Sequence, residues 1–292
     1  MIYLKSFSLL SARDEHFITT SYDTRRIYNT PYPLGMFPPR EFDKINFDNI
    51  TIFYGGNGSG KTTLLNIIAE KVNASRKNKV DKGNYFKIYV DQCNEEWNDS
   101  NCNDIKMISS DDIFDYLLDI RAINANVNRK KENLSQEWLE TKYTKITQNS
   151  LSDYESLKRS CEARSQTMSS YVRNRLVNNN IVEQSNGESA LMYWQREITE
   201  NSIYILDEPE NSLSAENQIR LKQFIEESAR FYNCQFIIST HSPFLLSLKF
   251  AKIYNLDTVP VTTQNWYELP NVLTYYNFFK ENEDEFKKLG NA

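Results

Sequence analysis

The residues best suited to chemistry form a glycine-rich segment, Gly55–Thr62, whose sequence GGNGSGKT matches the pattern G-x-x-x-x-G-K-[ST]. Glycine has no side chain to obstruct a ligand, so the backbone N–H groups of such a segment can turn inward around a phosphate. The lysine then reaches the β- and γ-phosphates of a nucleoside triphosphate, and the threonine hydroxyl can bind Mg²⁺. The residues predicted to contact the nucleotide are Gly55, Asn57, Gly58, Ser59, Gly60, Lys61, Thr62 and Thr63.

Two adjacent carboxylates, Asp207 and Glu208, follow the apolar run Ser202–Leu206 (SIYIL). A run of this length is typical of a buried strand, and α/β sheets bind ligands at the carboxyl ends of their strands. Taken alone, the pair could equally cap a helix. Beside a phosphate-binding loop, we expect Asp207 to hold Mg²⁺ together with Thr62, and Glu208 to orient and polarise the attacking water.

One of the two histidines of the chain, His241, follows a third apolar run, Gln235–Ser239, within the sequence STHSP. A lone histidine is more often structural than functional, but this one stands where another strand of the same sheet is expected to end. A neutral imidazole at that edge can contact the γ-phosphate and the attacking water. Because phosphoryl transfer depends mainly on positioning and charge neutralisation, we predict a catalytic set of Lys61, Glu208 and His241.

Strands and helices alternate around these motifs, as the apolar spacing indicates. Ile50–Tyr54 predicts a buried strand before the glycine loop, and Lys61–Val72 has helical spacing after it. Residues 215–231 predict a helix between the second and third runs, and Ala251–Leu256 predicts a further strand. This alternation indicates a parallel sheet. A terminal helix is expected at Tyr275–Leu289.

The N-terminal part of the chain contains further candidate strands. Ile2–Leu10, Phe17–Tyr22 and Tyr85–Val90 are rich in β-branched and aromatic residues, which favours strands. Residues 29–40 carry four prolines and a glycine and are expected to form a loop. The start of the chain lacks a small-residue cleavage site, so we interpret it as a first strand rather than a secretion signal.

The middle of the chain, residues 113–176, has a long, polar, helical pattern without proline. Residues 121–180 hold 11 lysines and arginines against 6 aspartates and glutamates, a balance of +5 in a chain whose net charge is −5. One interpretation is a solvated helical face, and the other is a docking surface for nucleic acid or an acidic partner. The sequence leaves both open.

Composition narrows the class of protein. With 292 residues, 40% of them hydrophobic and 25% charged, the chain has the balance of a globular protein and is neither fibrous nor wholly disordered. Its apolar runs are far shorter than the ~20 residues that cross a bilayer, so no direct contact with a membrane is expected. The cysteines form no CxxC pair, which indicates reduced thiols and a cytoplasmic location. They are Cys93, Cys102, Cys161 and Cys234.

Together these motifs resemble the ABC ATPase superfamily, and its soluble SMC-like and RecF-like branch more closely than transporter subunits. GGNGSGKTT is similar to the Walker A motif of that branch, and STHSP is similar to its switch-histidine segment. Ile203–Pro209 is similar to its Walker B motif with a catalytic glutamate. Ser185–Ser189 (SNGES) is similar to the short S-x-G-E/Q signature motif, and Ser185 lies 22 residues before Asp207.

The resemblance implies an α/β fold of the P-loop NTPase class and the ABC ATPase type. A mixed β-sheet core would carry an antiparallel N-terminal β subdomain and an inserted helical arm. The resemblance implies three domains. Residues 1–112 would contain the β subdomain and the P-loop half of the core, and residues 113–182 would form the helical arm. Residues 183–292 would contain the half of the core with the signature, Walker B and switch-histidine motifs, together with the C-terminal helix.

The resemblance also implies ATP and Mg²⁺ as ligands and a head-to-tail homodimer that encloses two ATP molecules. In such a dimer Ser185, Gly187 and Glu188 of one subunit would contact the ATP bound by the other. The segment Glu210–Leu213 resembles the D-loop of the group that reads DEPENSL. Ser214 stands where transporters usually carry an aspartate, so communication between the two sites is expected to differ here.

Two assignments stay open on the sequence. The Q-loop residue is either Gln92, after the expected strand Tyr85–Val90, or the pair Asp111–Asp112 after a possible strand at Lys106–Ser109. The later position is slightly favoured because Asp111 lies 50 residues after Lys61, although an aspartate departs from the family pattern. Candidates for adenine contacts are Arg25, Arg26 and Tyr28.

The predicted function is ATP binding and hydrolysis by an ATPase that dimerises and drives or gates a protein effector. The chain is similar to small stand-alone ATPases of bacteria, and to the ATPase domain of OLD-type proteins without the nuclease. Some of these accompany anti-phage or toxin effectors, and DNA-related roles are also implied. The alternative is a nucleotide-gated regulatory or scaffolding module with little turnover. A transporter subunit fits poorly, because the signature lacks the LSGGQ form.

Overall fold

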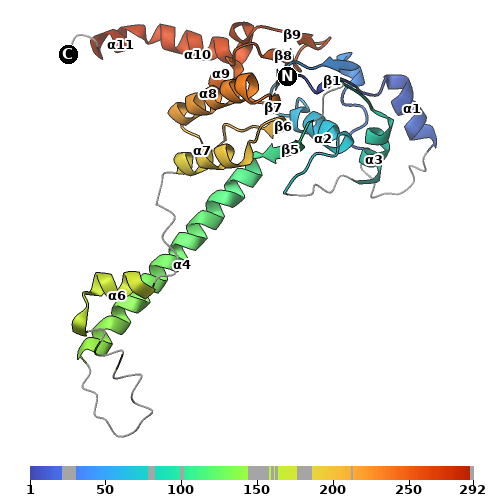
Figure 1. Cartoon of the computed structure of the whole chain (residues 1–292). Helices are drawn as coiled ribbons and strands as arrows, with labels where there is room; N and C mark the ends of the chain where they lie inside the picture. The colour runs from blue at the N-terminus through green and yellow to red at the C-terminus, as the bar shows by residue number, and fades with distance from the viewer. Residues whose placement is uncertain are drawn as a thin grey trace. The chain divides into compact units, whose positions relative to one another are not determined.

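The computed structural model of the chain (Figure 1) describes residues 1–21, 31–77, 83–98, 102–143, 158, 161, 164–175, 186–211 and 213–289. The chain divides into two compact units. The first unit comprises residues 1–114 and 186–292, and the second comprises residues 115–185. All the described strands belong to the first unit.

Six strands form the main sheet: β3 (Ile50–Tyr54), β5 (Asp104–Ser109), β6 (Ser202–Asp207), β7 (Gln235–Ser239), β8 (Lys252–Asn255) and β9 (Thr262–Thr263). Their order is β5-β6-β7-β3-β8-β9. Neighbours from β5 to β8 are parallel, and β9 pairs antiparallel with β8, so the sheet is mixed. Every residue of β3, β6 and β7 is buried, as expected for central strands covered on both faces. The strands predicted from the apolar runs are therefore confirmed.

Several helices pack around this sheet: α2 (Lys61–Lys71), α7 (Asn186–Glu197), α8 (Ala215–Phe231) and α9 (Pro243–Leu246). Helix α2 packs on β6 and β7, and α8 packs on β7, α7 and α9. The buried Leu221, Ile225 and Ala229 recur at four-residue spacing along one face of α8. Ser214 caps this helix by accepting a hydrogen bond from the N–H of Asn217. The helix predicted at residues 215–231 is confirmed.

A second, antiparallel sheet contains β1 (Leu4–Ser8), β2 (Lys44–Asn46) and β4 (Asn94–Trp97), in the order β2-β1-β4. The buried side chain of Gln235 on β7 fastens this sheet to the main one. Its Oε1 accepts hydrogen bonds from the N–H groups of Tyr3 and Leu4, each at 2.9 Å, and its Nε2 donates to Leu4 O at 2.8 Å. An antiparallel N-terminal β subdomain is confirmed.

The strand predicted at Phe17–Tyr22 is wrong, because the segment as far as Ser21 lies in helix α1 (Ala12–Ser21). Ser11 and Asp14 form a reciprocal cap at the start of this helix. Ser11 N donates to Asp14 Oδ2 at 3.1 Å, and Asp14 N donates to Ser11 Oγ at 3.4 Å. The cap outweighs the local preference of β-branched residues for strands.

The strand predicted at Tyr85–Val90 is also wrong, because this segment lies in helix α3 (Gly83–Gln92). Its four buried apolar residues recur at i, i+1, i+4 and i+5, which is the spacing of one helix face. They are Tyr85, Phe86, Tyr89 and Val90. Burial of this face therefore selects a helix over a strand.

The predicted terminal helix is two helices, α10 (Pro270–Glu281) and α11 (Glu283–Leu289). Asn282 separates them, and its side-chain Nδ2 donates to Phe278 O at 2.8 Å. These two helices carry large aromatic side chains that are between 46% and 59% exposed. They are Tyr275, Tyr276, Phe278, Phe279 and Phe286. The two helices extend toward the C-terminus in Figure 1.

The described part of the second unit contains most of α4 (Ser110–Tyr143) and all of α6 (Met168–Arg175). Its buried centre is formed by Trp138 and Tyr171. Cations cover both rings, with Lys142 Nζ 4.2 Å from the Trp138 ring centre and Arg175 Cζ 3.7 Å from the Tyr171 ring centre. Part of the positive charge of this region therefore packs on its own aromatic residues.

All four cysteines are free thiols. Within the described residues, no helix is both long and apolar enough to cross a bilayer. Across the same residues, no group of three or more His, Cys, Asp or Glu side chains is arranged to hold a metal ion.

Candidate functional site

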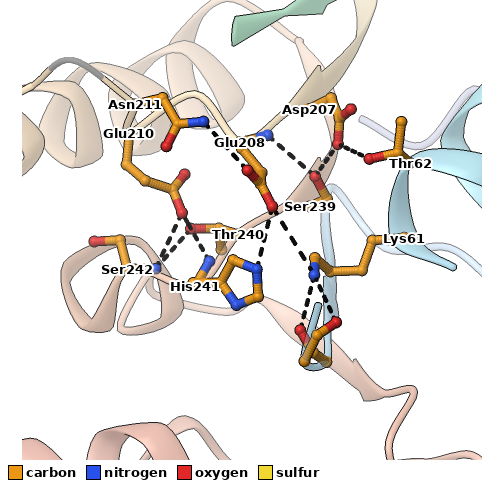
Figure 2. A network of polar contacts seen from close by, with 12 residues as sticks. Lys61, Thr62, Asp207, Glu208, Glu210, Asn211, Ser239, Thr240, His241 and Ser242 are labelled. Carbon is orange, nitrogen blue, oxygen red and sulfur yellow. Dashed lines mark hydrogen bonds and ion pairs between the residues drawn. The ribbon is translucent and has the colours of Figure 1, made fainter. Parts of the chain in front are cut away.

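The order of the strands brings three loops to one edge of the main sheet. Strands β6, β7 and β3 are parallel neighbours, so their carboxyl ends lie together. Ser239 at the end of β7 is level with Asp207 on β6 and with Phe53 on β3. The glycine loop, the Asp207–Glu208 pair and the His241 segment therefore converge, as Figure 2 shows.

The glycine loop joins β3 to α2 and needs glycine at two positions. Gly58 and Gly60 have φ angles of +80° and +91°, which other residues rarely adopt. At Gly60 an added Cβ would also lie 3.3 Å from Met36 Cε, because the loop packs against the proline-rich segment. Gly60 is the N-cap of α2 and offers no side-chain cap, so the first N–H groups of the helix can bind an anion.

Two residues outside the glycine loop hold its backbone, and no sequence motif marks either of them. Arg40 Nη1 donates to Ser59 O at 2.5 Å and to Leu256 O at 2.7 Å. Asp257, after β8, accepts the Gly56 N–H at 3.0 Å and 2.8 Å on its two carboxylate oxygens. Side chains from outside the loop therefore hold its backbone in place.

Lys61 is 5% exposed and lies within the loop. Its Nζ donates to Gly55 O at 2.8 Å and to Gly56 O at 3.2 Å, and lies 3.9 Å from Glu208 Oε1. Burial lowers the pKa of Lys61, and the nearby carboxylates, Glu208 first and then Asp207, oppose that effect. A buried amine held by carbonyl oxygens and a carboxylate is well placed to pair with a phosphate.

Asp207 combines with Thr62 to form a candidate Mg²⁺ site. Its Oδ1 accepts hydrogen bonds from Ser239 Oγ at 2.5 Å and from Thr62 Oγ1 at 3.2 Å. Burial raises the pKa of Asp207, and these two hydrogen bonds partly offset the rise. Mg²⁺ prefers hard oxygen ligands and is usually held by one or two carboxylates together with substrate phosphates. A carboxylate and a hydroxyl in contact beside the phosphate loop fit that description.

Glu208 lies between the histidine and the lysine. Its Oε1 is 3.1 Å from His241 Nε2 and 3.9 Å from Lys61 Nζ, while its Oε2 accepts from Asn211 Nδ2 at 3.2 Å. The side chains of Glu208 and His241 are 30% and 31% exposed, while the Nε2 atom of His241 is buried and has no hydrogen-bond partner among the described residues. The backbone of Glu208 has φ +48°, a strained conformation of the kind that concentrates at functional sites. Its N–H is held by Ser239 O and Ser239 Oγ, each at 3.1 Å.

The loops that carry Glu208 and His241 are joined by Glu210, which the sequence placed only in a D-loop-like segment. Glu210 Oε1 accepts hydrogen bonds from Thr240 Oγ1 at 2.6 Å, His241 N at 2.7 Å and Ser242 N at 3.1 Å. Burial raises the pKa of Glu210, and the hydrogen bonds it accepts oppose the rise. These contacts join residues distant in the sequence, so only the strand order could have indicated them.

The predicted signature residues have only partial structural placement. Ser185 lies outside the described residues, while Gly187 and Glu188 lie in the first turn of α7. The adenine candidates also lie outside the described residues. They are Arg25, Arg26 and Tyr28.

The two candidates for the Q-loop differ in position. Gln92 is exposed and is the last residue of α3, so the element before it is a helix and not the expected strand. Asp111 and Asp112 lie in the first turn of α4, which follows β5, and the end of β5 at Ser109 is level with Asp207. Asp112 Oδ2 accepts from Ser109 N and Ser109 Oγ, each at 2.8 Å. The later pair therefore lies at the same edge of the sheet as Asp207.

Two family models match the chain. The model described as ORC-CDC6-like matches residues 36–212, and the model described as AAA ATPase domain matches residues 188–246. No curated protein matches.

Solved structures similar to the chain include ATPase heads and cassettes. The SMC head domain from Thermotoga maritima is 15% identical, covers 87% of this chain and 94% of its own, and gives a TM-score of 0.38. An Smc head domain with an extended coiled coil, bound to the C-terminal domain of ScpA and derived from Pyrococcus furiosus, is 15% identical with coverages of 95% and 100% and a TM-score of 0.40. A nucleotide-free ATP-binding cassette from an ABC transporter is 14% identical with coverages of 94% and 99% and a TM-score of 0.42. At TM-scores this low the family assignment rests on the family models alone.

The ORC-CDC6-like model spans more than half of the chain, including the glycine loop and the Asp207–Glu208 pair. The AAA ATPase domain model includes the His241 segment. The chain therefore belongs to the ORC-CDC6-like family and is an ATPase, which binds and hydrolyses ATP.

Proposed function

We propose that ATP is hydrolysed at the carboxyl edge of the main sheet by Lys61, Glu208 and His241. The observation that carries this proposal is one carboxylate oxygen, Glu208 Oε1, which lies 3.1 Å from the imidazole and 3.9 Å from the lysine amine. A carboxylate between a phosphate-binding amine and an imidazole is suited to orienting a water molecule for attack on a phosphate.

Each member of this set has a distinct role. Lys61 binds the β- and γ-phosphates and neutralises their charge, while the amides of the glycine loop bind the remaining oxygens. Glu208 orients and polarises the attacking water. His241 contacts that water and the γ-phosphate, with its ring held beside Glu208. The nucleotide contacts would come from the loop residues Gly55, Asn57, Gly58, Ser59, Gly60, Thr62 and Thr63.

Thr62 and Asp207 would hold Mg²⁺. When bound there, the ion would neutralise charge on the β- and γ-phosphate oxygens. Ser239 keeps Asp207 in place through the hydrogen bond at 2.5 Å, which fixes the carboxylate for that role.

The direct test is the substitution Glu208→Gln, which keeps the shape of the side chain and removes its charge. The variant is expected to bind ATP with the affinity of the wild type and to lose turnover by about 10³-fold, within the range of general-base catalysis. Isothermal titration measures the first quantity and phosphate release the second. Wild-type turnover in Glu208→Gln would rule out the mechanism.

The proposal extends to a homodimer that encloses two Mg-ATP, with Ser185, Gly187 and Glu188 of each subunit completing the site of the other. The partial exposure of the Glu208 and His241 side chains, 30% and 31%, supports this arrangement, because another surface can then cover the ATP. Light scattering of Glu208→Gln with and without Mg-ATP tests it. A mass that doubles only with Mg-ATP is expected, and a mass that never changes would count against the dimer.

A protein effector driven or gated by this cycle is the further part of the proposal. Helix α10 begins at the site, where Asn271 Nδ2 donates to His241 O at 2.8 Å and Asn271 N donates to the Tyr54 hydroxyl at 3.2 Å. The same helix then exposes several large aromatic side chains, and exposed apolar surface of this kind marks interaction sites. A role in bacterial defence or in a DNA-related process would be exerted through such an effector.

A second candidate is a nucleotide-gated regulatory module with little turnover, in which nucleic acid or an effector binds the positively charged helical region. The balance of +5 over residues 121–180 supports binding of an acidic partner. Turnover that stays slow with DNA, RNA and effector present would favour this candidate. Rapid turnover stimulated by DNA would favour the first candidate, an ATPase whose hydrolysis cycle drives or gates an effector.

A further inference from the structure

The contacts between the loops after β6 and β7 suggest a role for a carboxylate that the proposed reaction does not use. We propose that Glu210 is a positioning residue, which fixes the backbone of the His241 segment so that the imidazole meets Glu208. This inference rests on the roles proposed above for Glu208 and His241.

The first observation is the concentration of donors on one oxygen. Glu210 Oε1 accepts the N–H of His241 at 2.7 Å, the N–H of Ser242 at 3.1 Å and the hydroxyl of Thr240 at 2.6 Å. Three consecutive residues are thus held by one side-chain atom. Because two of the donors are backbone amides, the contact fixes the path of the chain and not only a rotamer.

The second observation is the setting of this carboxyl group. Glu210 is 9% exposed, and its other oxygen, Oε2, is buried with no hydrogen-bond partner among the described residues. Burying a carboxyl group costs free energy, and the hydrogen bonds that offset this cost here are those that Oε1 accepts from the His241 segment. Such costs are typical of sites where geometry is needed for function.

The third observation is the position of Glu210 in the chain. It lies two residues after Glu208, with Pro209 between them, so a short and stiff segment links the two glutamates. Asn271 Nδ2 holds the opposite side of the same segment by donating to His241 O at 2.8 Å. The N–H and the carbonyl of His241 are therefore both fixed by side chains, and Glu210 relates the imidazole to the Glu208 loop.

This arrangement predicts which property of Glu210 matters. If the side chain acts by accepting amide N–H groups at a set distance, an uncharged group of the same length should serve. Glutamine keeps that length and presents a carbonyl oxygen, while aspartate keeps the charge but is shorter by one methylene. Misplacement of a reacting group by about 1 Å can lower turnover by about 10²-fold.

The experiment compares four variants by steady-state ATP turnover, nucleotide binding and melting temperature in the full chain. Glu210→Ala and Glu210→Asp are expected to lower kcat by about 10- to 100-fold with little change in KM for ATP, whereas Glu210→Gln stays within about threefold of the wild type. The control is Glu226→Ala, which removes another glutamate that accepts a backbone N–H, that of Lys249 at 2.9 Å, away from the site. Glu226→Ala is expected to leave kcat unchanged.

The outcomes separate the possible explanations. Wild-type kcat in Glu210→Asp, or a loss in Glu210→Gln as large as in Glu210→Asp, would overturn the positioning role. A fall in kcat that follows the fall in melting temperature in every variant, Glu226→Ala included, would show a purely structural role. If Glu210→Ala does not fold, the comparison of kcat between Glu210→Gln and Glu210→Asp tests the positioning role. Wild-type turnover in Glu208→Gln would instead show that the proposed function itself is wrong.

Discussion

Two glutamates accept backbone N–H groups at opposite ends of the main sheet, and their surroundings differ sharply. At the carboxyl ends of the strands, Glu210 is buried and belongs to a network that includes Asp207, Glu208 and His241 (Figure 2). Near the amino end of β3, Glu226 is half-buried and accepts the single N–H of Lys249.

A groove lies beside Glu226, at the amino end of the main sheet. It has a volume of about 650 Å³ and is lined by Phe231 and Phe250, with charged residues at its margin. The glycine loop and the ends of β6 and β7 lie away from this groove, at the carboxyl ends of the strands. The buried polar groups that carry the proposed chemistry therefore converge at the carboxyl edge of the sheet and not beside this groove.

The difference also concerns the cost of folding. The carboxyl edge buries a lysine and two carboxyl groups whose pKa values are displaced by burial. Such groups are expensive to bury and need partners. We expect substitutions at this edge to alter turnover more than stability, and substitutions at the amino edge to do the reverse.

The largest effect that would sharpen this contrast is expected for Lys61→Ala. Loss of an amine that binds phosphates should weaken ATP binding by about 10- to 100-fold, because hydrogen bonds to charged groups contribute ~1.5–3 kcal/mol. Binding of a fluorescent ATP analogue measures this. Lys71→Ala is the matched control, since Lys71 lies at the other end of α2 and donates to Asp91 O at 3.1 Å. Equal losses in the two variants would remove the contrast.

An intermediate effect is expected on the pH dependence of folding stability, measured in the protein without nucleotide. Burial raises the pKa of Glu210 above the ordinary value of 4.5, so the folded chain binds more protons than the unfolded chain above that pH. The contribution of Glu210 to stability is therefore greatest below pH 4.5 and falls as pH rises toward the displaced pKa. Glu210→Gln should remove this part of the pH dependence in denaturant titrations. A pH profile identical to that of the wild type would show that the group does not titrate in this way.

The smallest effect is expected for Glu226→Ala on stability. Loss of one partly buried hydrogen bond to a backbone N–H should lower the free energy of unfolding by ~0.5–1.5 kcal/mol. Urea denaturation measures the change, and phosphate release is expected to match the wild type. A large loss of turnover in this variant would mean that the two ends of the sheet are not functionally distinct.

Much of the fold could be predicted where local pattern and tertiary packing agree. The apolar runs at Ile50–Tyr54 and Gln235–Ser239 are strands, because central strands of a parallel sheet are apolar throughout. The prediction was wrong at Phe17–Tyr22 and Tyr85–Val90, where aromatic and β-branched composition competed with a helix cap and with helical spacing. Both competing signals were present in the sequence, in Ser11–Asp14 and in the spacing of the buried residues of α3.

The residues of the candidate site also divide into those that the sequence predicts and those that it does not. Lys61, Thr62 and Asp207 could be proposed from the sequence because motifs with fixed spacing mark them. Glu210 and Ser239 could not be placed, because their partners depend on β7 lying between β6 and β3. Strand order is a property of the folded chain, and no spacing within one motif reveals it.

The measurement that tests the central claim most directly is a double-mutant cycle on ATP turnover with Glu208→Gln, His241→Ala and both together. Glu208 Oε1 and His241 Nε2 are 3.1 Å apart, so two groups acting on one water should not contribute independently. We predict that the double variant turns over no more slowly than Glu208→Gln alone, within about threefold. Losses that multiply would show that the two residues act separately, and would contradict the account of a single carboxylate–imidazole unit at the edge of the sheet.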